Sequence, residues 1–168
     1  SIQATLIGRY ADGEYGKSKK AGEDLFFEYS EENEVKVLVY RFPNLFGKWC
    51  RPNYNSAVAT FCNNIANDLP IRIDAPEKEI RLVYIDDVVR SLLMCVCGEK
   101  SIDKDGFCVV SPEHYVSLQR LSDLLVSFRE GRKKLQVPDF TDPFVSKLYA
   151  TYLSYLPQDD FSYPLDTH

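Results

Sequence analysis

The chain contains few residues that could hold a metal ion or build a disulfide framework. There are only two histidines, His114 and His168, so a histidine-rich metal site is excluded. The five cysteines are odd in number, and none has the C-x-x-C spacing of a zinc or redox site. We therefore predict no metal and expect reduced, mostly buried thiols in a reducing compartment. They are Cys50, Cys62, Cys95, Cys97 and Cys108.

Long apolar runs and a secretion signal are also missing. The longest apolar stretch, from Val88 to Cys97, is interrupted by Arg90 and Ser91, whereas a membrane-spanning helix needs about 20 apolar residues. The first residues, SIQATLIGRY, lack the charged-then-apolar order of a signal peptide. We therefore predict no membrane partner and a cytoplasmic location.

Basic residues are too dispersed to form a nucleic-acid surface. The 168 residues include 20 Lys and Arg against 25 Asp and Glu, which gives a net charge of −5. One dense basic group lies at the end of an expected helix, where positive charge meets the negative end of the helix dipole. This group comprises Arg129, Arg132, Lys133 and Lys134. Nucleic acid is therefore not an expected partner.

A glycine-rich phosphate loop is absent as well. The eight glycines are scattered, and no Gly-x-x-Gly-x-x-Gly follows any expected strand. Such a loop holds the pyrophosphate of a dinucleotide at a helix N-terminus. The chain by itself is therefore not expected to bind a dinucleotide tightly.

Expected strands and helices alternate along the chain, which predicts an α/β fold. Apolar residues at three- and four-residue steps predict helices. We place these helices at 15–33, 55–67, 86–98 and 117–130 and within 143–156. We place strands at 1–7, 35–42, 71–73, 80–85 and 106–110. The segment 35–42, VKVLVYRF, is expected to be buried on both faces, as strands of parallel sheets are.

Several charged residues are expected to play ordinary structural roles. Asp86 or Asp87 is predicted to cap the helix that follows it, since aspartate is a favoured N-cap residue. Glu23 and Glu28 are predicted to be solvated charges on the first helix.

A tyrosine and a lysine stand four residues apart at the start of that first helix, in Tyr15-Gly-Lys-Ser-Lys19. Residues i and i+4 lie on one face of a helix, so both polar ends can reach one pocket. A nearby cation favours the phenolate form of a phenol. Such a tyrosine could exchange a proton with a carbonyl oxygen while a hydride is transferred at the carbon. The spacing alone is weak evidence for a catalytic pair. Tyr-x-x-x-Lys often arises by chance, and the two residues then have only a structural role.

Three blocks in order resemble the extended short-chain dehydrogenase/reductases, also called the NAD-dependent epimerase/dehydratase family. These blocks are YGKSKKAGE, RFPNLFG and LVYIDDVV. SIQATLIGRY, the run from YRFPNLFGKWCRPNYN to ANDLPI, and FSYPL are similar to one bacterial subgroup. In that subgroup, capsule-biosynthesis reductases, a reductase domain precedes a cupin domain. The resemblance covers roughly residues 1–165.

The resemblance implies a fold class and a domain organisation. Residues 1–156 would be the C-terminal part of a Rossmann-type parallel-sheet domain, including its small substrate-binding lobe. Residues 157–168 would be a linker toward a further domain. The chain would then be a fragment that lacks the N-terminal cofactor-binding half and the cupin.

The resemblance also implies roles for residues near the cofactor. Ser1, Tyr15 and Lys19 match the catalytic Ser-Tyr-Lys triad, with Tyr15 as the acid and base. Tyr15 and Lys19 would also contact the cofactor, Lys19 through the nicotinamide ribose hydroxyls. Pro43 and Asn44 occupy the loop that contacts the nicotinamide in the family, and Asn44 would also reach the substrate.

Three further residues match substrate-binding positions of the family. Asn55 and Ser56 open the helix that faces the nucleotide sugar, and amides at a helix N-terminus suit a diphosphate. Arg81 matches a phosphate contact, although a slip of one residue would turn it to the other face of its strand.

The function implied for the intact enzyme is NAD(P)H-dependent reduction of a 4-keto UDP-sugar in capsular polysaccharide biosynthesis. The resemblance implies NAD or NADP as cofactor without choosing between them. A homodimer through the Tyr15–Asn33 helix is expected, because family members pair through this helix. Two alternatives stay open: an epimerase or dehydratase of the same family, and a non-catalytic fragment that binds a nucleotide sugar or contacts a partner subunit.

Overall fold

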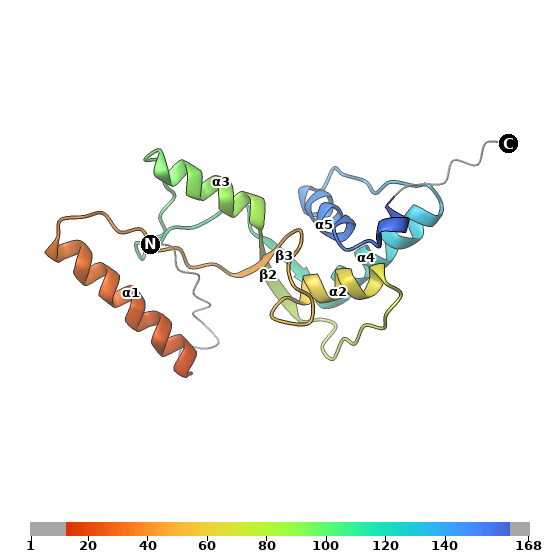
Figure 1. Cartoon of the computed structure of the whole chain (residues 1–168), viewed down its shortest axis with the longest axis horizontal. Helices are drawn as coiled ribbons and strands as arrows, with labels where there is room; N and C mark the ends of the chain where they lie inside the picture. Colours follow the sequence, from red (N-terminus) through yellow and green to blue (C-terminus); the bar gives the residue numbers. More distant parts are fainter. Residues whose placement is uncertain (1–12, 162–168) are drawn as a thin grey trace. The chain divides into compact units, whose positions relative to one another are not determined.

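The chain passes back and forth between two structural units in the computed structural model, which describes residues 13–161. Unit 1 comprises residues 1–44 and 86–113, and unit 2 comprises residues 45–85 and 114–168. Figure 1 labels the elements. In chain order they are α1 (Glu14–Glu32), β1 (Asn44–Phe46), α2 (Ala57–Ala66), β2 (Glu79–Tyr84), α3 (Ile85–Val96), β3 (His114–Ser117), α4 (Leu118–Lys133), α5 (Pro143–Leu153) and the short 3-10 helix η1 (Gln158–Asp160).

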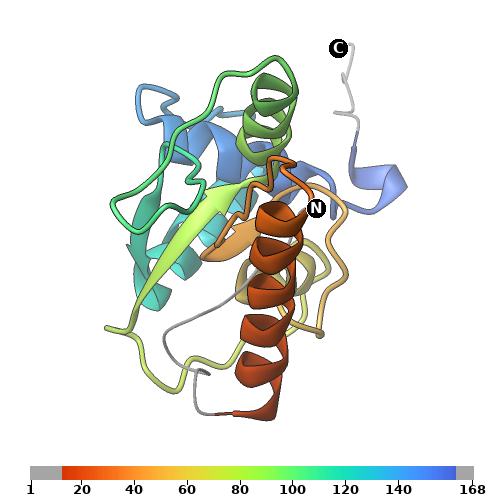
Figure 2. The same ribbon diagram turned by 90° about the vertical axis from the view of Figure 1, so that its left-hand side faces the viewer.

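A three-stranded sheet with the order β1-β2-β3 forms the centre of unit 2. β2, the light-green arrow in Figure 2, pairs with β3 in antiparallel register from Glu79 opposite Ser117 to Leu82 opposite His114. Successive side chains of a strand point to opposite faces. Accordingly, Leu82 lies in the core, whereas its neighbour Arg81 is exposed.

Three helices, α2, α4 and α5, lie together and build the core of unit 2 with this sheet (Figure 1). Side-chain caps define their starts: Ser56 accepts from the amide of Ala59, Ser117 from that of Arg120, and Asp142 from that of Phe144. The apolar faces of the helices and the sheet then exclude water together. The most deeply buried members of this core include Phe46, Val58, Cys62, Leu82, Leu121, Leu125, Phe128, Leu148 and Tyr152.

Unit 1 contains α1, α3 and two extended segments that meet in one parallel bridge between Tyr40 and Cys108. The amide of Cys108 donates to the carbonyl of Val39 at 2.8 Å. The Tyr40 hydroxyl lies 3.2 Å from the carbonyl oxygen of Ser91 on α3 and donates to it. Burial raises the pKa of Tyr40 to about 12, so the neutral, donating form holds α3 against this segment.

The helices were predicted well. The observed ranges of α1, α2, α3 and α4 lie within three residues of those predicted at both ends, and α5 falls inside the expected segment 143–156. No helix within residues 13–161 is long and apolar enough to span a membrane. The basic group at residues 129–134 does lie at the end of α4. The expected strand at 1–7 lies outside the described residues.

The strands were predicted less well. Within residues 13–161, the segment 35–42 forms no continuous ladder; Val39, Tyr40 and Phe42 are buried, but Val35 is 42% exposed. In the same part of the chain, 106–110 pairs through bridges at Cys108. The prediction of a strand at 71–73 is wrong, because this segment forms no ladder with any described residue, although Ile71 and Ile73 pack against the core. Conversely, β3 was not predicted.

Some predictions for single residues also need correction. α3 begins at Ile85, so Asp86 and Asp87 lie inside its first turn and neither precedes it as a cap. Asp87 is buried and pairs with Arg90 at 3.4 Å. Glu23 was expected in solvent but is only 1% exposed.

The five cysteines are free thiols, but the expectation that most are buried holds only in part. Cys62 and Cys108 are buried, whereas Cys97 is exposed. Burial raises the pKa of the Cys62 thiol, because a thiolate inside the apolar core would lose its hydration.

The close approach of Gly47 to Ile85 in unit 2 generates a stability prediction. A Cβ atom at Gly47 would lie 2.2 Å from Cγ2 of Ile85, so Gly47→Ala should lower the free energy of unfolding by about 1–3 kcal/mol. Urea unfolding measures the loss. The double variant with Ile85→Ala, which removes the clashing methyl, should lose less than the sum of the single changes. Equal midpoints for Gly47→Ala and the parent chain would contradict the clash.

Candidate functional site

Tyr15 and Lys19 lie together in the first two turns of α1. The Lys19 Nζ atom is 5.4 Å from the centre of the Tyr15 ring, which is the geometry of a cation–π contact. Tyr15 is 59% exposed, so its hydroxyl is open to a reactant. The structure thus places both residues on one face of α1, as the spacing predicts. Ser1, the third member of the predicted triad, lies outside the described residues.

Pro43 and Asn44 follow the buried end of the segment 35–42 in unit 1. Phe42 is 6% exposed, Pro43 is half-buried and Asn44 is exposed at the start of β1. Proline fixes its own φ and restricts the residue before it. The backbone conformations of Phe42 and Pro43 are therefore restricted where the chain passes from the buried Phe42 to the exposed Asn44.

Asn55 and Ser56 lie at the N-terminus of α2 in unit 2, as predicted. Asn55 is exposed, and Ser56 is the N-cap residue, whose Oγ accepts from the amide of Ala59 at 3.2 Å. The remaining free amides of the first turn carry the positive end of the helix dipole, which favours an anion. The Ser56 hydroxyl itself is engaged in the cap, so its contribution is first of all structural.

The loop before α2 presents two exposed aromatic side chains. Trp49 is 79% exposed and Tyr54 is 72% exposed. The loop is nevertheless tied to the end of α5: the amide of Trp49 donates to Oγ of Ser154 at 3.2 Å, and the Tyr155 hydroxyl donates to the carbonyl of Cys50 at 2.5 Å. These bonds hold the backbone from which both aromatic side chains project.

Arg81 is exposed in the middle of β2, opposite Tyr115 of β3. It lies on the other face of the strand from Leu82, which belongs to the core. The candidate residues therefore form two sets. Tyr15, Lys19, Pro43 and Asn44 belong to unit 1, and Asn55, Ser56 and Arg81 belong to unit 2.

Sequence reasoning missed an ion pair between a buried carboxylate and a half-buried guanidinium on the helix that carries Tyr15 and Lys19. The Glu23 carboxylate accepts from Arg41 through both oxygens, from Nε at 3.3 Å and from Nη2 at 2.7 Å. The Arg41 guanidinium carbon lies 3.3 Å from the centre of the Phe107 ring. The Glu23 side chain is 2% exposed and that of Arg41 is 32% exposed, so the carboxylate is buried while its partner reaches solvent. The signal in the sequence was Arg41 itself, a charge in a segment expected to be buried.

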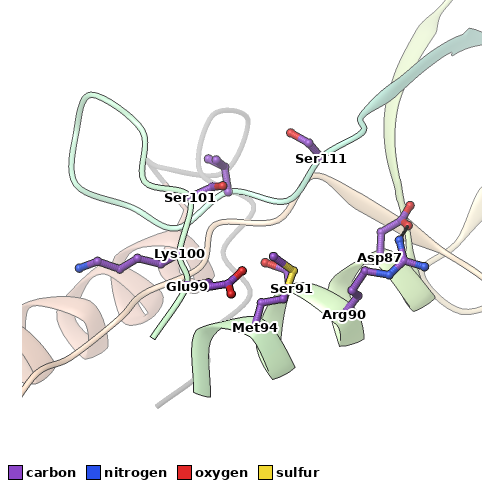
Figure 3. A pocket seen from close by; sticks show the side chains of 9 residues that line it. Asp87, Arg90, Ser91, Met94, Glu99, Lys100, Ser101 and Ser111 are labelled. Atoms are coloured by element: carbon purple, nitrogen blue, oxygen red, sulfur yellow. Dashed lines mark hydrogen bonds and ion pairs between the residues drawn. The ribbon is translucent and has the colours of Figure 1, made fainter. Parts of the chain in front are cut away.

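A hollow of about 310 Å³ in unit 1 also escaped prediction. Asp87, Arg90 and Ser91 of α3 line one side, and Ser101 and Ser111 approach from the chain that follows (Figure 3). The lining combines carboxylates, cations and hydroxyls, which suits a small polar molecule. Neither Tyr15 nor Lys19 lines this hollow.

Residues 4–107 match the family model described as the NAD dependent epimerase/dehydratase family. The match includes α1, β1, α2, β2 and α3, and it ends one residue before Cys108. The chain belongs to this family. Membership agrees with the resemblance carried by the Tyr15 block, the RFPNLFG block and the LVYIDDVV block.

Individual relatives support the assignment. The chain is 45% identical over 168 residues to a UDP-2-acetamido-2,6-beta-L-arabino-hexul-4-ose reductase from Pseudomonas aeruginosa. The crystal structure of the capsular polysaccharide assembling protein CapF from Staphylococcus aureus matches with a TM-score of 0.90 and 42% identity over 97% of this chain. The UDP-glucose 4-epimerase of Thermotoga maritima matches with a TM-score of 0.66, 19% identity and 84% coverage of this chain, which shows the Rossmann-type fold alone.

The chain spans about half the length of the relatives named above. It covers 43% of the Pseudomonas reductase, 45% of the CapF chain and 52% of the Thermotoga epimerase. The residues present fit only part of a nicotinamide cofactor. Lys19 beside Tyr15 suits the ribose next to the nicotinamide, but no glycine-rich pyrophosphate loop occurs in the sequence.

The cap at Ser56 generates a test that separates its structural role from a binding role. Ser56→Ala should lower the free energy of unfolding by about 1 kcal/mol, because the amide of Ala59 loses its acceptor. Ser56→Asp keeps an acceptor and should retain the stability of the parent chain. Urea unfolding of both variants decides the matter. If Ser56→Ala is as stable as the parent chain, the hydroxyl is not needed as a cap.

Proposed function

We propose that the intact protein is an NAD(P)H-dependent reductase of a 4-keto UDP-sugar that acts in capsular or other surface polysaccharide biosynthesis. The observation that carries the proposal is the position of Tyr15 and Lys19 on one face of α1, in a chain that is 45% identical along its whole length to a reductase of this class. Family membership supports the use of a nicotinamide cofactor.

In this proposal, Tyr15 bonds the substrate carbonyl oxygen and delivers a proton to it. When bound, the cofactor supplies the hydride that reduces the carbonyl carbon. The product is a hydroxyl group, with its proton taken from the Tyr15 phenol. Lys19 stabilises the phenolate left behind and holds the ribose hydroxyls next to the nicotinamide. Ser1 adds a second hydroxyl to the same oxygen, and Pro43 and Asn44 border the reacting groups.

The nucleotide part of the substrate is assigned to unit 2. The N-terminus of α2 at Asn55 and Ser56 offers backbone amides and the positive end of a helix dipole to a diphosphate. Arg81 offers a guanidinium that can bond two phosphate oxygens at once.

The role of Tyr15 as proton donor predicts a large loss of activity when its hydroxyl group is removed. In the full-length protein, Tyr15→Phe should lower kcat for NAD(P)H oxidation with a UDP-4-keto sugar by at least about 100-fold, because the proton donor is lost. Tyr29→Phe, on the same helix and also exposed, is the matched control and should retain the activity. UDP binding, measured by calorimetry, should be equal in both variants.

Three outcomes would contradict either the role of Tyr15 or the reductase function. Tyr15→Phe with the kcat of the parent protein would remove Tyr15 from the reaction. Interconversion of sugars without net consumption of NAD(P)H would favour an epimerase, a class to which a relative from Arabidopsis thaliana, 32% identical over 83 residues, belongs by name. UDP binding with no turnover in the full-length protein would favour a non-catalytic binding module.

The proposal includes a homodimer through the Tyr15–Asn33 helix and a cytoplasmic location, with residues 157–168 as a linker. The α1 surface supports the dimer, since Leu25 is 65% exposed and Tyr29 is 55% exposed. Burial of such side chains against a second copy would remove apolar area from water.

The dimer has its own test. Leu25→Glu combined with Tyr29→Glu should convert the full-length protein to a monomer in sedimentation at micromolar concentration, because charges would be buried in the contact. The control is Leu69→Glu, an exposed leucine of unit 2, which should leave the dimer intact. A parent protein that sediments as a monomer would contradict the dimer itself.

A further inference from the structure

The buried carboxylate of Glu23 lies on the same helix as the candidate catalytic pair. Glu23 follows Lys19 by four residues and Tyr15 by eight, so the three side chains form one stripe that turns by about 40° at each step. Its side chain is 2% exposed. Of the nineteen residues of α1, Gly16 and Glu23 are the buried ones. Glu23 is therefore the one charged side chain that α1 buries completely.

The partner of Glu23 is held in place from two sides. Arg41 binds both carboxylate oxygens, at 3.3 Å and 2.7 Å, and its guanidinium carbon lies 3.3 Å from the centre of the Phe107 ring. Phe27 of α1 makes an edge-to-face contact with the same ring at 6.1 Å. The guanidinium is planar and its donors form a rigid fork, so this arrangement fixes direction as well as distance.

Arg41 also lies two residues before Pro43. The ion pair therefore links α1 directly to the segment that leads into Pro43 and Asn44, all within unit 1. A helix is stiff, and Glu23 lies about 12 Å along the axis from Tyr15. A rotation of α1 about its axis at Glu23 is therefore passed on to Tyr15 and Lys19.

Stability alone is a poor reason for such a pair. A buried ion pair can often be replaced by apolar side chains of similar volume at no loss of stability. Apolar side chains, however, lack direction and would let the helix rotate or slide against its neighbour. The fork geometry is the property that an apolar contact could not supply.

We propose that the Glu23–Arg41 pair, stacked on Phe107, is a positioning device that sets the rotation of α1 and thereby aims Tyr15 and Lys19 toward the reacting groups beside Pro43 and Asn44. Glu23 and Arg41 are positioning residues in this proposal, because they act through Tyr15 and Lys19. The proposal rests on the function proposed above, in which Tyr15 is the proton donor.

The test uses the full-length protein and an apolar replacement of the pair, Glu23→Met with Arg41→Met. This double variant should fold with a urea midpoint close to that of the parent protein. Its kcat should fall about 10- to 100-fold, because small displacements of catalytic groups cost that much, whereas KM for the UDP-sugar should change less than about twofold. The primary isotope effect on kcat with deuterated NAD(P)H should rise as the chemical step becomes limiting.

A matched control lies on the same helix. Asp24 forms an exposed pair with Lys20 at 2.7 Å, so Asp24→Asn removes a carboxylate from α1 without touching the buried pair. It should leave kcat, KM and the isotope effect unchanged. If Glu23 had a purely structural role, the double variant Glu23→Met with Arg41→Met would show a smaller folded fraction and an unchanged isotope effect.

The outcomes separate this proposal from the proposed function. A folded Met/Met variant with the kcat and isotope effect of the parent protein would overturn the positioning role, while loss of activity in Tyr15→Phe would leave the function in place. Should the Met/Met variant fail to fold, Arg41→Lys carries the same test, because it keeps the charge and loses the fork. Its kcat should fall in the same way, and an unchanged kcat would overturn the proposal.

Discussion

The orientation of α1 depends on the Glu23 carboxylate, because Glu23 and Gly16 are the fully buried residues of this helix. A carboxylate can lie inside a protein only when its charge is met, and both of its oxygens bond Arg41. The contact is directional, unlike the apolar contacts that usually hold a surface helix. The candidate catalytic residues Tyr15 and Lys19 thus depend on an interaction in which neither takes part.

Unit 2 is stabilised by burial of apolar side chains. Three helices and a sheet bury a large continuous apolar core, with Leu121, Leu125 and Leu148 completely inaccessible to solvent. Capping side chains settle where the helices begin, and one of these caps, Ser56, is at the same time a candidate substrate contact. Candidate residues in unit 2 therefore lie on an apolar framework, whereas α1 of unit 1 is contacted through the Glu23–Arg41 pair and the Phe27–Phe107 ring contact.

The sequence predicted helices better than strands. A helix satisfies its own backbone, so the period of apolar residues in α2 or α4 is visible locally. A strand exists only where another segment supplies hydrogen-bond partners. The segment 71–73 has the composition of a strand but no partner among the residues that the structure describes, while β3 forms because β2 accepts it in register. Glu23 was placed in solvent because nothing near it in the chain shows which face it occupies.

Local patterns in the chain were enough to predict the helices, the family and the spacing that places Tyr15 and Lys19 on one face of α1. Each of these depends on residues that are close together in the chain. The pairing of strands and the burial of charges become visible in the folded chain, because these depend on residues far apart in the sequence. Glu23 and Arg41 are 18 residues apart, and a carboxylate becomes a buried anchor only when folding removes its water and brings a guanidinium in its place.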